Sequence, residues 1–226
     1  MTQAIINCTH VTYGSIRPDN AIWNTVRGSA AGTAYDTILR ADNQWTTGDK
    51  YWFYRGFVQF DTSSIPSGAL LGSAALRFPS GLQVLNSKEN SMSFALLSGM
   101  PTYPSNPMVY ADFALSKYPN FVLWHDFTGL VWDGSDYTYD TASSIDVFRF
   151  STATELAFIQ KGAGAVTKFC LVTEYDYNNS PPGASGLTQH YFKSHQFIDS
   201  NAVQLVVDYV LSAQEVRTDR ASGVSS

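Results

Sequence analysis

The sequence is poor in charge and has no cluster of basic residues. Only 15% of its 226 residues are charged, and its 14 Lys and Arg are scattered among 19 Asp and Glu. Nucleic-acid binding needs a basic patch or stripe, so we expect no nucleic-acid partner. Glutamate and lysine, which favour helices, are scarce, whereas Ser, Thr, Tyr and Phe, which favour strands and turns, are plentiful.

Targeting signals are also missing. The first residues, Met-Thr-Gln-Ala-Ile-Ile-Asn-Cys, contain neither a basic segment nor a long apolar one. The sequence has no run of about 18 apolar residues, the length that a membrane-spanning helix requires. We therefore expect no signal peptide and no membrane partner.

Cysteine is almost absent, because Cys8 and Cys170 are the only two. Both lie in strand-like segments, and a disulfide between an early and a late strand is geometrically feasible. Two reduced, buried thiols are the commoner outcome, so we expect these and keep the bridge as the alternative. Neither cysteine has a CxxC partner or the spacing of a metal ligand.

Known catalytic motifs are absent as well. The sequence has no Gly-x-Ser-x-Gly elbow, no Walker loop and no His-Glu-x-x-His. His190 and His195 are five residues apart and would lie on opposite faces of a strand. Calcium could bind oxygens of three aspartates that lack the EF-hand order, so a hairpin turn is the favoured interpretation; they are Asp133, Asp136 and Asp140. We expect no catalytic residue, no metal and no cofactor, and hence no enzyme.

Strand patterns are what the sequence does contain, most clearly in residues 55–78. Apolar residues alternate at Val58 and Phe60 and again at Ala74, Leu76 and Phe78, as in half-buried strands. The connector between the two alternating segments contains hydroxyl residues, a proline and a glycine, which together favour an ordered loop. We therefore expect these five apolar residues in the core.

Residues 55–78 also resemble a known family. The run Arg-Gly-x-x-x-Phe-Asp-x-Ser-Ser-Ile-Pro-x-Gly-Ala, followed by Gly-Ser-Ala-x-Leu-Arg-Phe, is similar to the signature of DNRLRE-type β-sandwich domains. Weaker matches lie in residues 35–40, 168–176 and 203–209. The resemblance implies a jelly-roll-like sandwich, found in carbohydrate-binding modules of bacterial surface proteins and in structural or decoration proteins of phage-like particles. Such a scaffold does not determine function by itself.

We therefore predict an all-β protein, an antiparallel β-sandwich of jelly-roll type. A single domain is expected over residues 1–211, and an extended C-terminal tail over residues 212–226. One short helix is predicted over residues 152–161, because Thr152 and Glu155 have capping-box spacing. Other expectations are a short strand within residues 21–32, a polar loop over 42–50, and a surface excursion over 99–119 with a helical turn at 111–117.

Aromatic side chains are the main candidates for a binding site. Trp52 and Tyr54 share the alternation of Val58 and Phe60, so we expect them in the core. Other rings lie beside predicted turns or in the proline-rich excursion, where they are expected to be exposed to sugars or partner proteins. These candidates are Trp45, Trp132, Tyr137, Tyr139, Tyr103 and Tyr110.

The preferred functional hypothesis is a non-enzymatic structural protein of a phage virion, a capsid decoration or tail-associated protein assembled in the host cytoplasm. Its partners would be other virion proteins or copies of itself. Arg217 and Arg220 in the polar tail would contact a neighbouring subunit. The alternative is a carbohydrate-binding module that recognises a polysaccharide through exposed aromatics. A polysaccharide-degrading enzyme is the least favoured, because no acid and base pair is recognisable.

Overall fold

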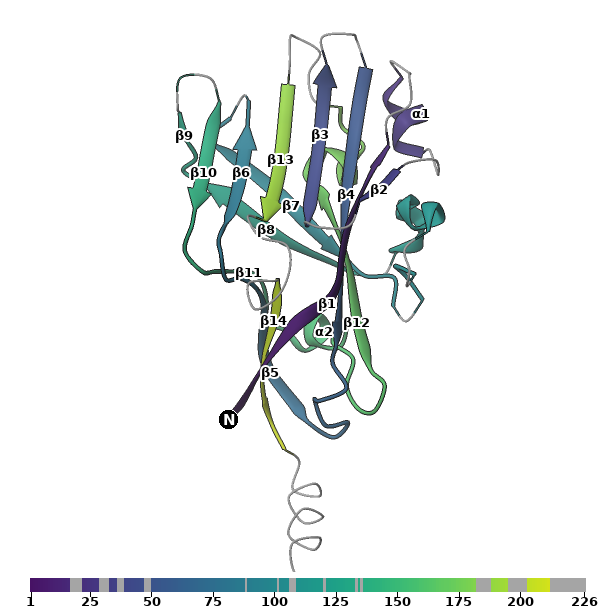
Figure 1. Ribbon diagram of the computed structural model, residues 1–226, viewed down its shortest axis with the longest axis vertical. Coiled ribbons are helices and arrows are strands. Elements are labelled where there is room, and N and C mark those ends of the chain that lie inside the picture. The colour runs from purple at the N-terminus through teal and green to yellow at the C-terminus, as the bar shows by residue number, and fades with distance from the viewer. Residues whose placement is uncertain are drawn as a thin grey trace, which may run out of the picture.

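The computed structural model describes residues 1–16, 22–28, 33–35, 39–46, 50–87, 89–100, 102–105, 109–119, 121–132, 134, 136–181, 188–194 and 203–211. These residues form mostly antiparallel β-sheet in a sandwich-like arrangement, which confirms the predicted all-β class (Figure 1). The strands are β1 (Thr2–Ile16), β2 (Thr33–Tyr35), β3 (Arg40–Thr46), β4 (Lys50–Asp61), β5 (Leu70–Phe78), β6 (Leu82–Asn86), β7 (Ser91–Leu97), β8 (Val122–Thr128), β9 (Val131–Trp132), β10 (Tyr137–Thr141), β11 (Ile145–Phe150), β12 (Val166–Thr173), β13 (Thr188–Ser194) and β14 (Gln204–Val210).

The helices are short. They are α1 (Trp23–Gly28), α2 (Ala153–Leu156), α3 (Glu174–Asn178) and the 3₁₀ turns η1 (Tyr110–Phe113) and η2 (Leu115–Lys117). The two 3₁₀ turns confirm the helical turn predicted in the excursion. Thr152 caps α2 through the predicted capping box with Glu155, although the helix has only four residues.

Strand β4 pairs with three other strands. One edge of β4 pairs with β1 from Phe53 to Phe60. The other edge pairs with β3 from Lys50 to Tyr54, and then with β12 from Gly56 to Asp61. The sheet therefore divides beside Arg55 into two branches, β3–β13–β6–β10–β9 and β12–β7–β8. In Figure 1 the first branch stands upright in the upper half, and β7 and β8 run obliquely to it.

Gly56 makes this division sterically feasible. A Cβ atom at this position would lie 2.7 Å from Leu39 Cδ1 and 2.8 Å from the carbonyl oxygen of Arg40. Both contacts are closer than real Cβ atoms allow, so any side chain would push the start of β3 away. The Arg-Gly pair at the start of the family-like signature thus lies where the branches separate.

The main core lies between the two branches of the sheet and the paired strands β5 and β11. The ring of Phe192 lies at its centre, 5.3 Å from the rings of Phe78 and Phe94 and 6.0 Å from that of Phe127. The residues predicted from the alternation in the signature are buried there: Val58, Phe60, Ala74, Leu76 and Phe78. The predicted register of β4 and β5 is confirmed for these residues.

A second apolar cluster covers the opposite face of β4, β12 and β7. In this cluster Trp23 of α1 packs against Tyr51 and Phe53. Phe113 and Tyr118 of the excursion pack against Phe57. The described part of residues 99–119 is therefore largely a cover for the sheet. Because both faces of β4 are covered, the strand lies at the interior of the molecule.

A buried ion pair links β4 to three other segments. Arg55 is fully buried, and its Nε and Nη2 donate to Asp176 of α3 at 2.6 and 2.8 Å. Nη1 donates to the carbonyl oxygen of Phe113 in η1, and Nη2 also donates to that of Arg27 in α1 at 3.1 Å. Arg27 in turn donates to the backbone oxygen of Asp176 at 2.6 Å. The Arg55–Asp176 pair is bidentate, and the network as a whole satisfies most of the guanidinium donors of Arg55.

Several local predictions were wrong. Residues 23–28 form helix α1 where a short strand was expected, and residues 40–46 form strand β3, although 42–50 were interpreted as a polar loop. The described residues contain three α-helices rather than one. The polar side chains of β3 misled the interpretation, because Asp42 and Asn43 are fully buried. Tyr54 is buried as predicted, whereas Trp52 is only half-buried.

Gln59 is a further correction. The alternation of β4 suggests that Gln59 faces away from the core, where its truncation should have little effect. The side chain is in fact 2% exposed, and its Nε2 donates to the carbonyl oxygen of Ser105 at 2.9 Å. The excursion covers this face, so the second face of β4 is not in solvent.

We predict that Phe60→Ala lowers the free energy of unfolding by about 3–5 kcal/mol, because it leaves a cavity in the main core. Gln59→Ala should cost about 1 kcal/mol through the lost hydrogen bond. Chemical denaturation of the two variants measures both values. Equal losses would show that the assigned faces of β4 are wrong.

A second prediction concerns the buried ion pair. Asp176→Ala leaves Arg55 buried without its counter-charge, and should lower the free energy of unfolding by about 3–5 kcal/mol. The matched control is Asp146→Ala, which removes an Arg77–Asp146 pair with partly exposed side chains and should cost about 0–1 kcal/mol. Similar losses in the two variants would contradict the structural role of the buried pair.

Candidate functional site

The structure places the sequence-predicted aromatics in different parts of the molecule. Trp132 of β9 is 53% exposed and follows Val131, which is 69% exposed. Trp45 is half-buried in β3, and its ring lies 4.3 Å from that of Tyr51. Tyr139 of β10 packs on the main core, 5.7 Å from the ring of Phe127. Of these three candidates, only Trp132 presents most of its ring to solvent.

The other candidates contribute less to a common site. Tyr103 is half-buried, and the Nζ atom of Lys117 lies 4.1 Å from its ring centroid. The backbone of Tyr110 and Tyr137 lies in η1 and β10, but their side chains are outside the described part of the structure. Arg217 and Arg220, like the rest of the tail, lie outside the described residues.

A different surface stands out at the lower end of the molecule in Figure 1, where β1 begins, β5 begins and β14 ends. Ile6 and Leu205 pair in register and point into the core, so Ile5 points outward and is 53% exposed. Leu70 and Val210 pair in register and are 64% and 41% exposed. Ile5 pairs with Val206, four residues before Val210 on β14, so it lies apart from this pair. We call Leu70 and Val210 the apolar end.

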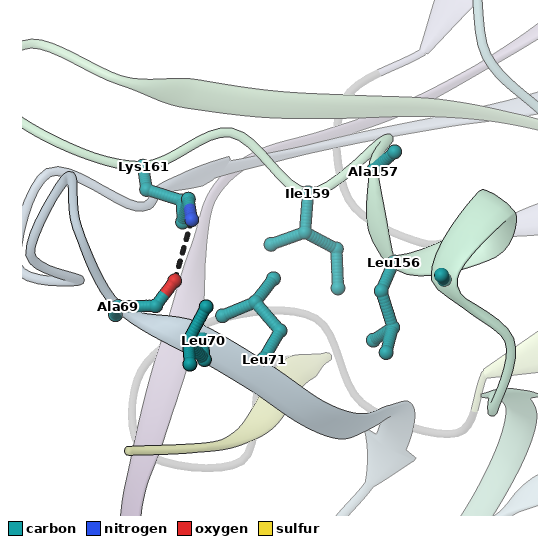
Figure 2. Close-up of a pocket in the computed structure, with 8 residues that line it drawn as sticks. Ala69, Leu70, Leu71, Leu156, Ala157, Ile159 and Lys161 are labelled. Atoms are coloured by element: carbon teal, nitrogen blue, oxygen red, sulfur yellow. Dashed lines mark hydrogen bonds between the residues drawn. The ribbon is translucent and has the colours of Figure 1, made fainter. Parts of the chain in front are cut away.

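An apolar pocket adjoins the apolar end. It has a volume of about 240 Å³ and is lined by Ala69, Leu70, Leu71, Ala153, Leu156, Ala157, Ile159 and Lys161. Figure 2 shows the side chains of Leu71, Leu156 and Ile159 converging in it. At its edge the ammonium group of Lys161 donates to the carbonyl oxygen of Ala69 at 2.5 Å. The exposed Leu70 therefore stands beside an apolar recess with one cation at its rim.

A row of polar groups lies on the same face, between Ile5 and the Leu70–Val210 pair. Gln3 of β1 and Ser73 of β5 both donate to the carboxylate of Asp208 on β14, at 3.0 and 2.8 Å. These hydrogen bonds lower the pKa of Asp208. The bonds join three neighbouring strands, so Ile5, Leu70 and Val210 project from a firmly paired sheet.

Burial shifts the pKa values of both cysteines and of His125. Cys8 and Cys170 are free thiols, as expected; Cys170 is buried, whereas Cys8 is only half-buried. Burial raises the pKa of Cys8 to about 11 and also raises that of Cys170, so both are weak nucleophiles. Burial lowers the pKa of His125.

The described part of the chain contains neither a cluster of metal ligands nor a membrane-spanning helix. Its His, Cys, Asp and Glu residues include no group of three or more that could hold a metal ion. Asp133 lies outside the described residues. No helix that the structure describes is long and apolar enough to cross a membrane.

Comparison with known proteins gave no relative: no protein-family model matches the chain, and no curated protein sequence is similar to it.

Sequence reasoning missed the apolar end. Leu70 and Val210 occur in apolar stretches that read as ordinary core strands. Gly72 is a signal in the sequence, because a glycine within a strand often marks a bulge. In the structure the pairing of β5 with β14 shifts by one residue at Gly72. That bulge changes which face Leu70 occupies.

Proposed function

We propose that the protein is a non-enzymatic structural protein of a phage particle that attaches to a partner subunit through its apolar end. The observation that carries the proposal is the exposed pair of Leu70 and Val210 next to an apolar pocket. Surface apolar groups clustered in this way are typical of protein contacts. The particle itself is suggested by the resemblance of residues 55–78.

The contact would gain free energy mainly from Leu70. Burial of a largely exposed leucine contributes about 1.5–3 kcal/mol, and well-packed central side chains dominate protein interfaces. The pocket next to Leu70 would accept an apolar side chain of the partner. The amine of Lys161 at its rim favours a partner with an acidic group there.

Substitution at the apolar end tests this proposal. Leu70→Lys and Val210→Lys should each change the free energy of unfolding by less than about 0.5 kcal/mol, because both side chains are exposed. Each should weaken self-association or attachment to phage particles by about tenfold or more, since a charge would enter an apolar contact. Light scattering, with the protein alone and with particles added, measures the association.

The matched control is Val131→Lys, which places a lysine at an exposed valine of β9. It should leave attachment unchanged. Undiminished association of both apolar-end variants would remove the assembly proposal.

Carbohydrate binding is the second candidate, and the exposure of Trp132 favours it. A flat indole face suits the apolar face of a sugar ring. Tyr137 pairs with Trp132 in register, so a second aromatic residue lies opposite it in the sheet.

Affinity electrophoresis in gels that contain polysaccharides tests the second candidate. A carbohydrate-binding protein should be retarded, and Trp132→Ala should abolish the retardation, because the stacking surface is removed. Trp124→Ala is the control, since it removes an exposed tryptophan on β8. Free migration of the unmodified protein in every gel would exclude this candidate.

A further inference from the structure

Two exposed aromatic rings meet at a right angle where α3 lies beside β7 and β8. The ring of Trp124 on β8 lies 5.0 Å from the ring of Tyr177 on α3, and their planes are inclined at 84°. The side chains are 37% and 38% exposed. They therefore form an open aromatic corner on the surface.

Two carboxylates lie beside the aromatic corner. Asp126 follows Trp124 by two residues, so both side chains are on the outer face of β8. Ser93 of β7 pairs with Asp126 in register, and its Oγ donates to Asp126 Oδ1 at 2.7 Å. The backbone N–H of Ser93 donates to Glu174 Oε1 at 3.4 Å. Ser93 thus holds a carboxylate of the strand and a carboxylate of α3 near the two rings.

The electrostatic environment of the corner is negative. Partial burial raises the pKa of Glu174, and the neighbouring acidic groups Glu89 and Asp126 raise it further. Arg27 reaches the backbone oxygen of Tyr177 at 3.3 Å and shares the carboxylate of Asp176 with Arg55, so the negative charge of the corner comes from Asp126, Glu174 and Glu89. A cationic ligand would therefore be attracted to the corner.

The geometry discriminates between ligand shapes. A flat sugar ring can stack on only one of two perpendicular rings, whereas a rounded cation can contact both. Cations bind over aromatic faces within about 6 Å of the ring centroid, and tryptophan is the strongest partner. Asp126 and Glu174 already accept hydrogen bonds from Ser93. These bonds hold the two carboxylates beside the rings. The methyl groups of a quaternary ammonium ion offer apolar surface to both rings at once, so a cation of this shape fits the corner.

We propose that Trp124 and Tyr177, with the charges of Asp126 and Glu174, bind a small quaternary ammonium ion. The rings pack against its methyl groups, and the carboxylates balance its charge. This site is distinct from the apolar end and is independent of the assembly proposal.

Choline is the probe, and NMR spectra of the tryptophan indole N–H groups report its binding. Choline should shift the Trp124 signal in a saturable way and leave the Trp132 signal unchanged. The uncharged carbon isostere of choline should bind about tenfold more weakly, and Asp126→Asn should weaken choline binding about threefold. Tyr177→Ala should abolish binding. The indole signal that is missing from Trp124→Ala belongs to Trp124, and this variant should also fail to bind choline. Trp132→Ala is the control and should bind choline normally.

Three results would overturn the proposal. The first is the absence of a saturable shift at Trp124. The second is equal binding of choline and its uncharged isostere, which would show an apolar contact only. The third is tighter binding of methylammonium than of choline, which would show that the corner receives a basic protein side chain. Thermal unfolding of each variant distinguishes a lost site from a lost fold, because both rings are exposed and their removal should leave the midpoint nearly unchanged.

Discussion

The buried pair of Arg55 and Asp176 is the interaction on which the arrangement of the sheet depends. Arg55 lies where β4 changes its neighbour from β3 to β12, and Asp176 lies in α3, directly after β12. A charge in this interior position requires a counter-charge and hydrogen bonds, since its desolvation would otherwise be very costly. The requirement fixes α3, α1 and η1 around one guanidinium group.

The covering of both faces of β4 determines which segments remain at the molecular surface. Because both faces of β4 are covered, two apolar clusters form, one between the branches and one beneath α1 and the excursion. The long loop that sequence reasoning associated with function is used in part to close the second cluster. Large exposed apolar groups include those at the apolar end, at Trp132 and at the aromatic corner.

These three surfaces differ in chemistry, so they favour different ligands. The apolar end combines aliphatic side chains with a recess and suits a protein side chain. Trp132 offers a single exposed ring, and the aromatic corner adds carboxylates to two rings. The two free thiols have raised pKa values, so neither is an activated nucleophile.

The sequence by itself determined the fold class, the core positions of β4 and β5 and the cap of α2, because alternation and capping depend on residues close together in the chain. Tertiary structure decided the rest. The polar residues of β3 suggested a loop, yet Asn43 is buried because Thr173, 130 positions away, donates a hydrogen bond to it. No local pattern pairs Arg55 with Asp176, and the exposure of Leu70 or Trp124 depends on which distant segments cover each face. Local preferences therefore specify strands, whereas the partners of buried charges and the uncovered surfaces follow from contacts between residues far apart in sequence.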